Sequence, residues 1–124
     1  MPDLSKNVVL LVQDTMVRKG LEILLTDMSF GVVAAGSISE LDVSLTASNI
    51  IPDLFISLLM FENNQASIKW LRILRQRYQV ELPAIFFNNE AAIMESQITD
   101  DNLLIVSDQI QPAKLRQKIA ECIA

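Results

Sequence analysis

Short apolar runs recur along the chain, and they constrain its fold more than any other feature. Runs such as "VVLLV", "LFI" and "LLIV" show no alternation of polar and apolar residues. This pattern is typical of parallel strands that are buried on both faces between layers of helices. No run approaches the roughly 18 residues that a membrane span needs. The sequence therefore predicts an α/β protein without a membrane-spanning segment.

Segments with helical periodicity separate these runs. Strands are predicted at 8–12, 31–35, 54–58, 84–87 and 103–106, and helices at 15–27, around Leu41 and Leu45, at 65–78, at 90–98 and from Pro112 onward. In the first helix the apolar positions step by three and four, which leaves Arg18, Lys19, Glu22 and Thr26 on the water-facing side. Ser37 stands three residues before Glu40, the spacing of a capping box. Pro112 suits the first turn of the last helix.

Strands that alternate with helices predict one doubly wound parallel sheet with helices on both faces. The length of 124 residues suits a single domain over 1–124. In such a sheet, ligands bind in the crevice beyond the carboxyl ends of the strands. The residues predicted at these ends are Gln13, Asp14, Leu58 to Met60, Asn88, Asn89, Ser107 and Asp108.

Charge and composition exclude several function classes. The net charge is −5, from 10 basic and 15 acidic residues, and there is no histidine. The chain thus lacks the positive footprint of a nucleic-acid-binding domain and cannot use serine-histidine or cysteine-histidine catalysis. The single Cys122 cannot form an internal disulfide, and we interpret it as buried filler. The amino terminus has no signal-peptide pattern, so we expect a cytoplasmic protein.

Four longer stretches can be compared with known families: "VVLLVQDTMVRKGLEILL", "PDLFISLLM", "LPAIFFNN" and "LLIVSDQIQPAKL". They resemble the response-regulator receiver family of two-component signalling, and the likeness spans essentially the whole chain. The resemblance implies a flavodoxin-like sheet of order 2-1-3-4-5. It also implies a signalling or transcription-regulating domain with a pocket for phosphorylation.

The residues of that pocket depart from the family's pattern. By resemblance, Gln13 replaces the first acid of the metal-binding pair and Asp14 keeps the second, while Leu58 falls where the phosphate-accepting aspartate belongs. Asn88 stands for the switch hydroxyl, and Asp108 stands for the lysine. A leucine side chain has no atom able to attack phosphorus, and magnesium prefers clustered oxygen ligands. The sequence thus predicts a degenerate receiver: no enzyme, no cofactor, no metal, and no phosphorylation.

Two other functions remain open at this stage. One is an atypical phosphotransfer domain that uses Ser57, or Asp53 at the far end of the same strand. The other is a small-ligand sensor that fills the crevice with a nucleotide or metabolite. Against the first, a strand serine is ordinarily buried and satisfied by a carbonyl. Asp14, for its part, has the structural alternative of capping the helix that follows it.

An inert pocket shifts the function to surfaces, so we expect a protein partner or a homodimer. The face that the resemblance indicates draws on Ala91, Met94, Ile98, Ile105, Ile110 and Lys114. Ile98 and Ile105 have the alternative reading of core residues. Trp70, flanked by basic residues, predicts either a second contact patch or a helix flank that covers the sheet edge.

Overall fold

The structure, a computed structural model, describes residues 6–48, 50–58, 65–87, 102–106 and 111–123. The strands are β1 (Asn7–Val12), β2 (Gly31–Ala35), β3 (Leu54–Leu58), β4 (Ala84–Phe87) and β5 (Leu103–Val106). The helices are α1 (Thr15–Asp27), α2 (Ile38–Ser48), α3 (Gln65–Tyr78) and α5 (Pro112–Ile123). The helix predicted at 90–98 lies outside the described residues. Every other predicted element is present, and its bounds agree to within one residue where the sequence set them.

All five strands are parallel and lie in the order β2-β1-β3-β4-β5. The chain moves from β1 outward to β2, then crosses back to β3 on the other side of β1. The winding therefore reverses between β1 and β3, and the predicted doubly wound, flavodoxin-like sheet is confirmed.

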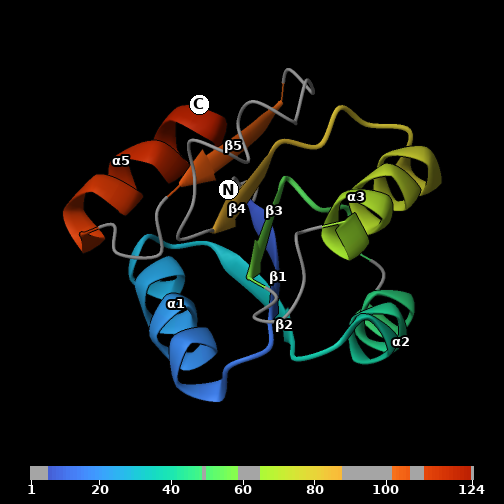
Figure 1. Ribbon diagram of the computed structural model, residues 1–124, viewed down its shortest axis with the longest axis horizontal. Helices are drawn as coiled ribbons and strands as arrows, with labels where there is room; N and C mark the ends of the chain where they lie inside the picture. Colours follow the sequence, from blue (N-terminus) through green and yellow to red (C-terminus); the bar gives the residue numbers. More distant parts are fainter. Residues whose placement is uncertain (1–5, 49, 59–64, 88–101, 107–110, 124) are drawn as a thin grey trace, which may run out of the picture.

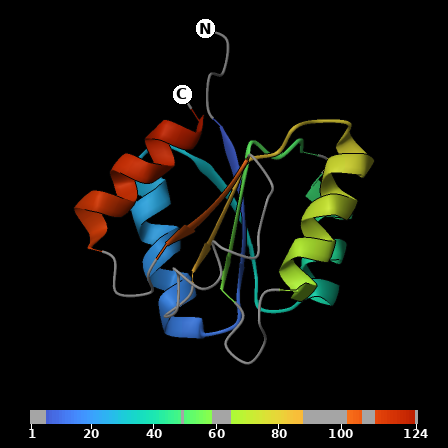
Figure 2. The same cartoon turned by 45° about the horizontal axis from the view of Figure 1, so that its top comes forward.

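Helices cover both faces of this sheet. Helices α1 and α5 lie on one face and α2 and α3 on the other, as Figures 1 and 2 show from two directions. Alternate residues of β1 point to opposite faces: Val9 and Leu11 pack with α2 and α3, while Val8 and Leu10 pack with α1 and α5. This two-sided burial explains why β1 has no polar alternation.

Local signals in the sequence begin the helices. The Ser37 hydroxyl accepts a hydrogen bond from the Glu40 amide at 3.2 Å, as the capping-box spacing predicted. Pro112 is the first residue of α5, where its missing N–H costs no helical hydrogen bond. Helices α2 and α5 therefore begin after the carboxyl ends of the strands that they follow, on the side of the sheet where the crevice is predicted.

Candidate functional site: the carboxyl ends of β1 and β3

Parallel pairing brings the ends of β1 and β3 together. Val12 lies opposite Leu58 in the register, and the Gln13 amide donates to the Leu58 carbonyl at 3.2 Å. The structure thus brings the backbones of Gln13 and Leu58 together at the point where the winding reverses, with Asp14 next along the chain. Asn88 and Asp108, the other two residues of the predicted pocket, lie outside the described residues.

Asp14 caps helix α1. Its backbone is extended (φ −74°, ψ 123°), and its Oδ1 accepts a hydrogen bond from the Val17 amide at 3.0 Å. This geometry is that of an N-cap residue, which satisfies one of the amides that a helix start leaves unpaired. The structural alternative for Asp14 is therefore present in the structure, and the side chain remains exposed to solvent.

Leu58 presents hydrocarbon at the end of β3. Its half-buried side chain packs against the core between the sheet and helices α1 and α5. The neighbouring Ser57 has no exposed surface and takes part in an interaction of its own. A phosphodonor from solvent cannot reach a hydroxyl in that position without opening of the sheet.

Asp53 lies at the opposite end of the sheet. Its Oδ2 accepts a hydrogen bond from the Asn7 amide at 2.7 Å, which ties the start of β3 to the start of β1. It is separated from Leu58 by the whole length of β3. Asp53 therefore belongs to a structural contact away from the crevice.

Arg18 differs from its prediction as a water-facing residue of α1. Its side chain is half-buried, and Nη1 donates to the Val12 carbonyl at 2.8 Å. The spacing of apolar residues, which placed Arg18 on the water-facing side, gives only the position of its Cα on the helix. A long side chain can fold back over the end of a neighbouring strand, and no spacing in the sequence signals this.

The donor set for a metal ion is small in this region. Among the described residues, no group of three or more His, Cys, Asp or Glu side chains lies close enough to hold a metal ion. Asp14 is the only carboxylate that the sequence predicted for the described part of the crevice, and its Oδ1 is already engaged with Val17. A separate point concerns membranes. Among all the residues that the structure describes, no helix is both long and apolar enough to cross a bilayer.

The predicted partner surface is placed only in part. Lys114 is exposed on α5. Ile105 of β5 pairs with Phe86 of β4 in the strand register. Ala91, Met94, Ile98 and Ile110 lie outside the described residues. Trp70 is 7% exposed and belongs to the core between the sheet and helices α2 and α3. The contact-patch alternative for Trp70 is thus not met, because the indole packs inward and helps to cover the sheet.

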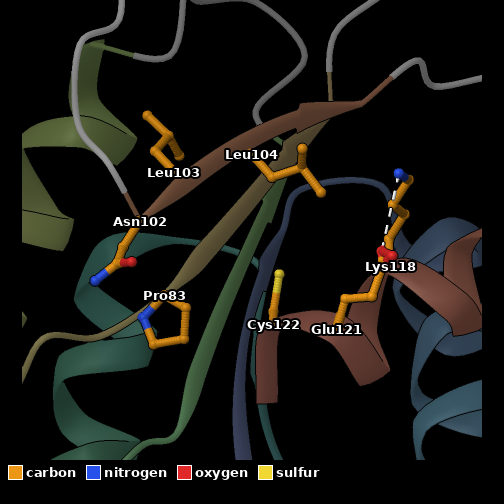
Figure 3. Close-up of a pocket in the computed structure, with 7 residues that line it drawn as sticks. All are labelled: Pro83, Asn102, Leu103, Leu104, Lys118, Glu121 and Cys122. Atoms are coloured by element: carbon orange, nitrogen blue, oxygen red, sulfur yellow. Dashed lines mark ion pairs between the residues drawn. The ribbon is translucent and has the colours of Figure 1, made fainter. Parts of the chain in front are cut away.

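A separate hollow of about 350 Å³ lies at the other end of the sheet, between β5 and the last turns of α5. Figure 3 shows its lining: Pro83, Asn102, Leu103 and Leu104 on the strand side, with Lys118, Glu121 and Cys122 from α5. Burial first, and then the Glu121 carboxylate, raises the pKa of the Cys122 thiol, while Lys118 acts in the opposite direction. Cys122 is half-buried, so its predicted role as filler is met only partly.

Comparison with known proteins places this geometry among solved folds. No protein-family model and no curated protein matches the sequence. The structure is similar to a response regulator receiver protein from Sinorhizobium medicae, with a TM-score of 0.78 and 17% identity over 97% of this chain and 95% of that one. It is also similar to the chemotaxis protein CheY4 of Vibrio cholerae, with a TM-score of 0.76 and 15% identity over 95% of this chain and 98% of that one.

A third similar structure is the receiver domain of the PhyR response regulator from Erythrobacter litoralis. Its TM-score is 0.74 and its identity 15%, over 95% of this chain and 89% of that one. The TM-scores show that these proteins share the fold of the present chain, while few residues are identical. The chain therefore has the fold of the response-regulator receiver domains.

Proposed function

We propose that this chain is a degenerate receiver domain that acts in signal transduction through protein contacts and not through phosphorylation. It works by binding, as a dimerisation or partner-docking module of a cytoplasmic regulator. The observation that carries the proposal is the position of Leu58. It ends β3 directly beside the end of β1, where the winding of the sheet reverses.

The chemistry at this position supports the proposal. Formation of an acyl phosphate needs a carboxylate oxygen that attacks phosphorus, and the Leu58 side chain contains only carbon and hydrogen. A phosphoryl group also needs a cation or a donor to balance its charge. By resemblance to receivers, Asp108 stands where a lysine would balance it, and an aspartate repels an incoming anion. The nucleophile and its electrostatic support are thus both replaced.

The two alternatives from the sequence gain less support. Phosphotransfer through Ser57 requires a hydroxyl accessible to the donor, whereas Ser57 has no exposed surface. A ligand sensor requires a built polar site, and the polar groups at the described crevice are engaged within the fold: Asp14 with Val17 and Arg18 with Val12. The interaction module accounts for both observations.

Phosphodonor labelling tests the chemical half of the proposal. The protein is incubated with acetyl phosphate and Mg²⁺ beside a receiver known to be phosphorylated, and intact mass is measured at neutral pH. We expect the control receiver to gain a phosphoryl group and this protein to gain none. Stoichiometric labelling of any residue of this chain contradicts the proposal.

Sedimentation analysis tests the binding half. Lys114→Glu reverses a charge on the exposed side of α5, and Arg72→Glu makes the same change on the exposed side of α3, across the sheet. If the protein self-associates through the face that includes α5, only the Lys114 variant weakens that association. If the protein is monomeric at all concentrations, the partner is another protein. Binding of a candidate partner is then compared between the Lys114→Glu and Arg72→Glu variants.

A further inference from the structure

We propose that Arg18 is a built-in latch that holds the β1–α1 and β2–α2 connections in one arrangement, so that this side of the crevice keeps its shape without a ligand. The latch deepens the proposed function, since a module that works without phosphorylation needs a crevice whose form does not depend on a bound group. Its evidence lies in Val12, Arg18 and Gly36.

The first contact joins helix α1 to the end of β1. Pairing of these two strands runs to Leu11 opposite Ala35, and Gln13 turns to β3 on the other side. One residue beyond the last pair, Arg18 Nη1 donates to the Val12 carbonyl at 2.8 Å. A guanidinium on helix α1 thus occupies a backbone acceptor at the carboxyl end of the sheet.

The second contact is with Gly36, the residue that follows β2. A Cβ added to Gly36 would lie 2.6 Å from Arg18 Nη1 and 3.5 Å from Cζ, so the guanidinium lies directly against the glycine. No glycine in the described chain has a positive φ. The glycine at this position is therefore explained by the space that the arginine occupies and not by backbone conformation.

The two contacts join segments that lie next to each other in space. In Figures 1 and 2 the connections after β1 and β2 leave the same end of the sheet, the first toward α1 on one face and the second toward α2 on the other. Gly36 precedes Ser37 at the start of α2. The Ser37 hydroxyl accepts a hydrogen bond from the Glu40 amide, and the Ser37 carbonyl accepts one from the Leu41 amide. Movement of the guanidinium is thus transmitted to the first hydrogen bonds of α2.

Native-state hydrogen exchange measures the latch directly. In Arg18→Met, which keeps most of the side-chain length but removes the donors, the Glu40 and Leu41 amides are expected to exchange roughly tenfold faster or more, as a hydrogen bond from a charged group implies. The Phe55 amide of the buried central strand β3, which donates to the Pro83 carbonyl at 3.0 Å, reports general destabilisation because such core amides exchange only through large openings. We expect it to change much less.

Gly36→Ala gives an independent route to the same state. The added methyl group displaces the end of a flexible side chain, so this variant alone is expected to speed exchange at Glu40 and Leu41 much as Arg18→Met does. In the Arg18→Met background the guanidinium is gone, and Gly36→Ala is expected to have little further effect. Coupling of this kind is what a double-mutant cycle detects.

Two matched variants complete the design. Gly20→Ala adds the same methyl group where nothing lies within 4 Å, and Arg72→Met removes an exposed arginine from α3. Neither is expected to alter exchange at the start of α2. Additive effects of Arg18→Met and Gly36→Ala, or equal acceleration at the Phe55 amide, overturn the latch. These results do not depend on phosphodonor labelling, so failure of the latch and failure of the proposed function are distinguishable.

Discussion

At the scale of single residues, side chains near the crevice serve the fold itself. Asp14 satisfies an amide of α1, and Arg18 satisfies a carbonyl of β1. Here their hydrogen bonds are within the protein, which is consistent with a site that is maintained for structure.

Asp14 gives a prediction that separates its cap from any role in binding a cation. Asp14→Ala is expected to lower the free energy of unfolding by about 1 kcal/mol, the usual cost of a lost N-cap. Asp14→Asn keeps a capping oxygen and is expected to stay close to wild type in urea denaturation. Mg²⁺ at millimolar concentration should leave the stability of all three proteins unchanged. A stabilisation by Mg²⁺ that only Asp14 supports would indicate a metal site instead.

Cys122 gives a prediction about pH. Burial raises the pKa of its thiol, so the folded protein holds the thiol proton more tightly than the unfolded chain. The associated stability is complete below the thiol pKa of the unfolded chain, about 8.5, and is lost as pH rises through the higher folded value. Alkylation by iodoacetamide at pH 8 should be slower in the native protein than in urea. Cys122→Ser is expected to remove this part of the alkaline stability loss.

At the scale of elements, α1 carries an unusual outward stripe. Met16 and Ile23 are 84% and 71% exposed, and Gly20 lies between them on the same side of the helix. The opposite side holds the buried Leu21 and Leu25. The amphipathic pattern thus fixes which side faces the sheet, even though the outer side is less polar than in most surface helices.

Gly20 lies in this outward stripe, and its replacement gives a prediction about stability. Because a Cβ there meets open space, Gly20→Ala is expected to stabilise the protein by about 0.5–1 kcal/mol through helix propensity alone. The midpoint of urea unfolding should rise while the slope stays constant. A loss of stability would contradict this expectation and show that the helix needs a glycine here.

At the scale of the whole molecule, one sheet joins two cores. Residues of β1 contribute to both, since Val9 packs on the α2–α3 side and Val8 on the α1–α5 side. Neither helix layer has a core without the strands. We therefore expect both faces to unfold together in a single cooperative transition.

The single tryptophan allows a test of this cooperativity. Trp70 reports from the α2–α3 side, while Leu25, which has no exposed surface, packs on the opposite face. Leu25→Ala is expected to cost about 2–5 kcal/mol. Trp70 fluorescence and far-UV circular dichroism should register the same shift in midpoint. Two transitions that separate in the variant would show that the faces unfold independently.

The sequence by itself determined the order of the elements, the parallel sheet and the leucine at the end of β3. Apolar runs and helical periodicity specify these locally, and a strand end needs no distant contact to be located. Tertiary structure alone decided where long side chains went: Arg18 folded onto Val12 and Gly36, and Trp70 packed into the core. Such side chains choose among partners brought near by folding: Val12 lies six residues from Arg18, whereas Gly36 comes from the next strand connection. The physical reason is that periodicity fixes the direction of a Cα–Cβ bond, whereas the position of a guanidinium or an indole depends on the surfaces around it.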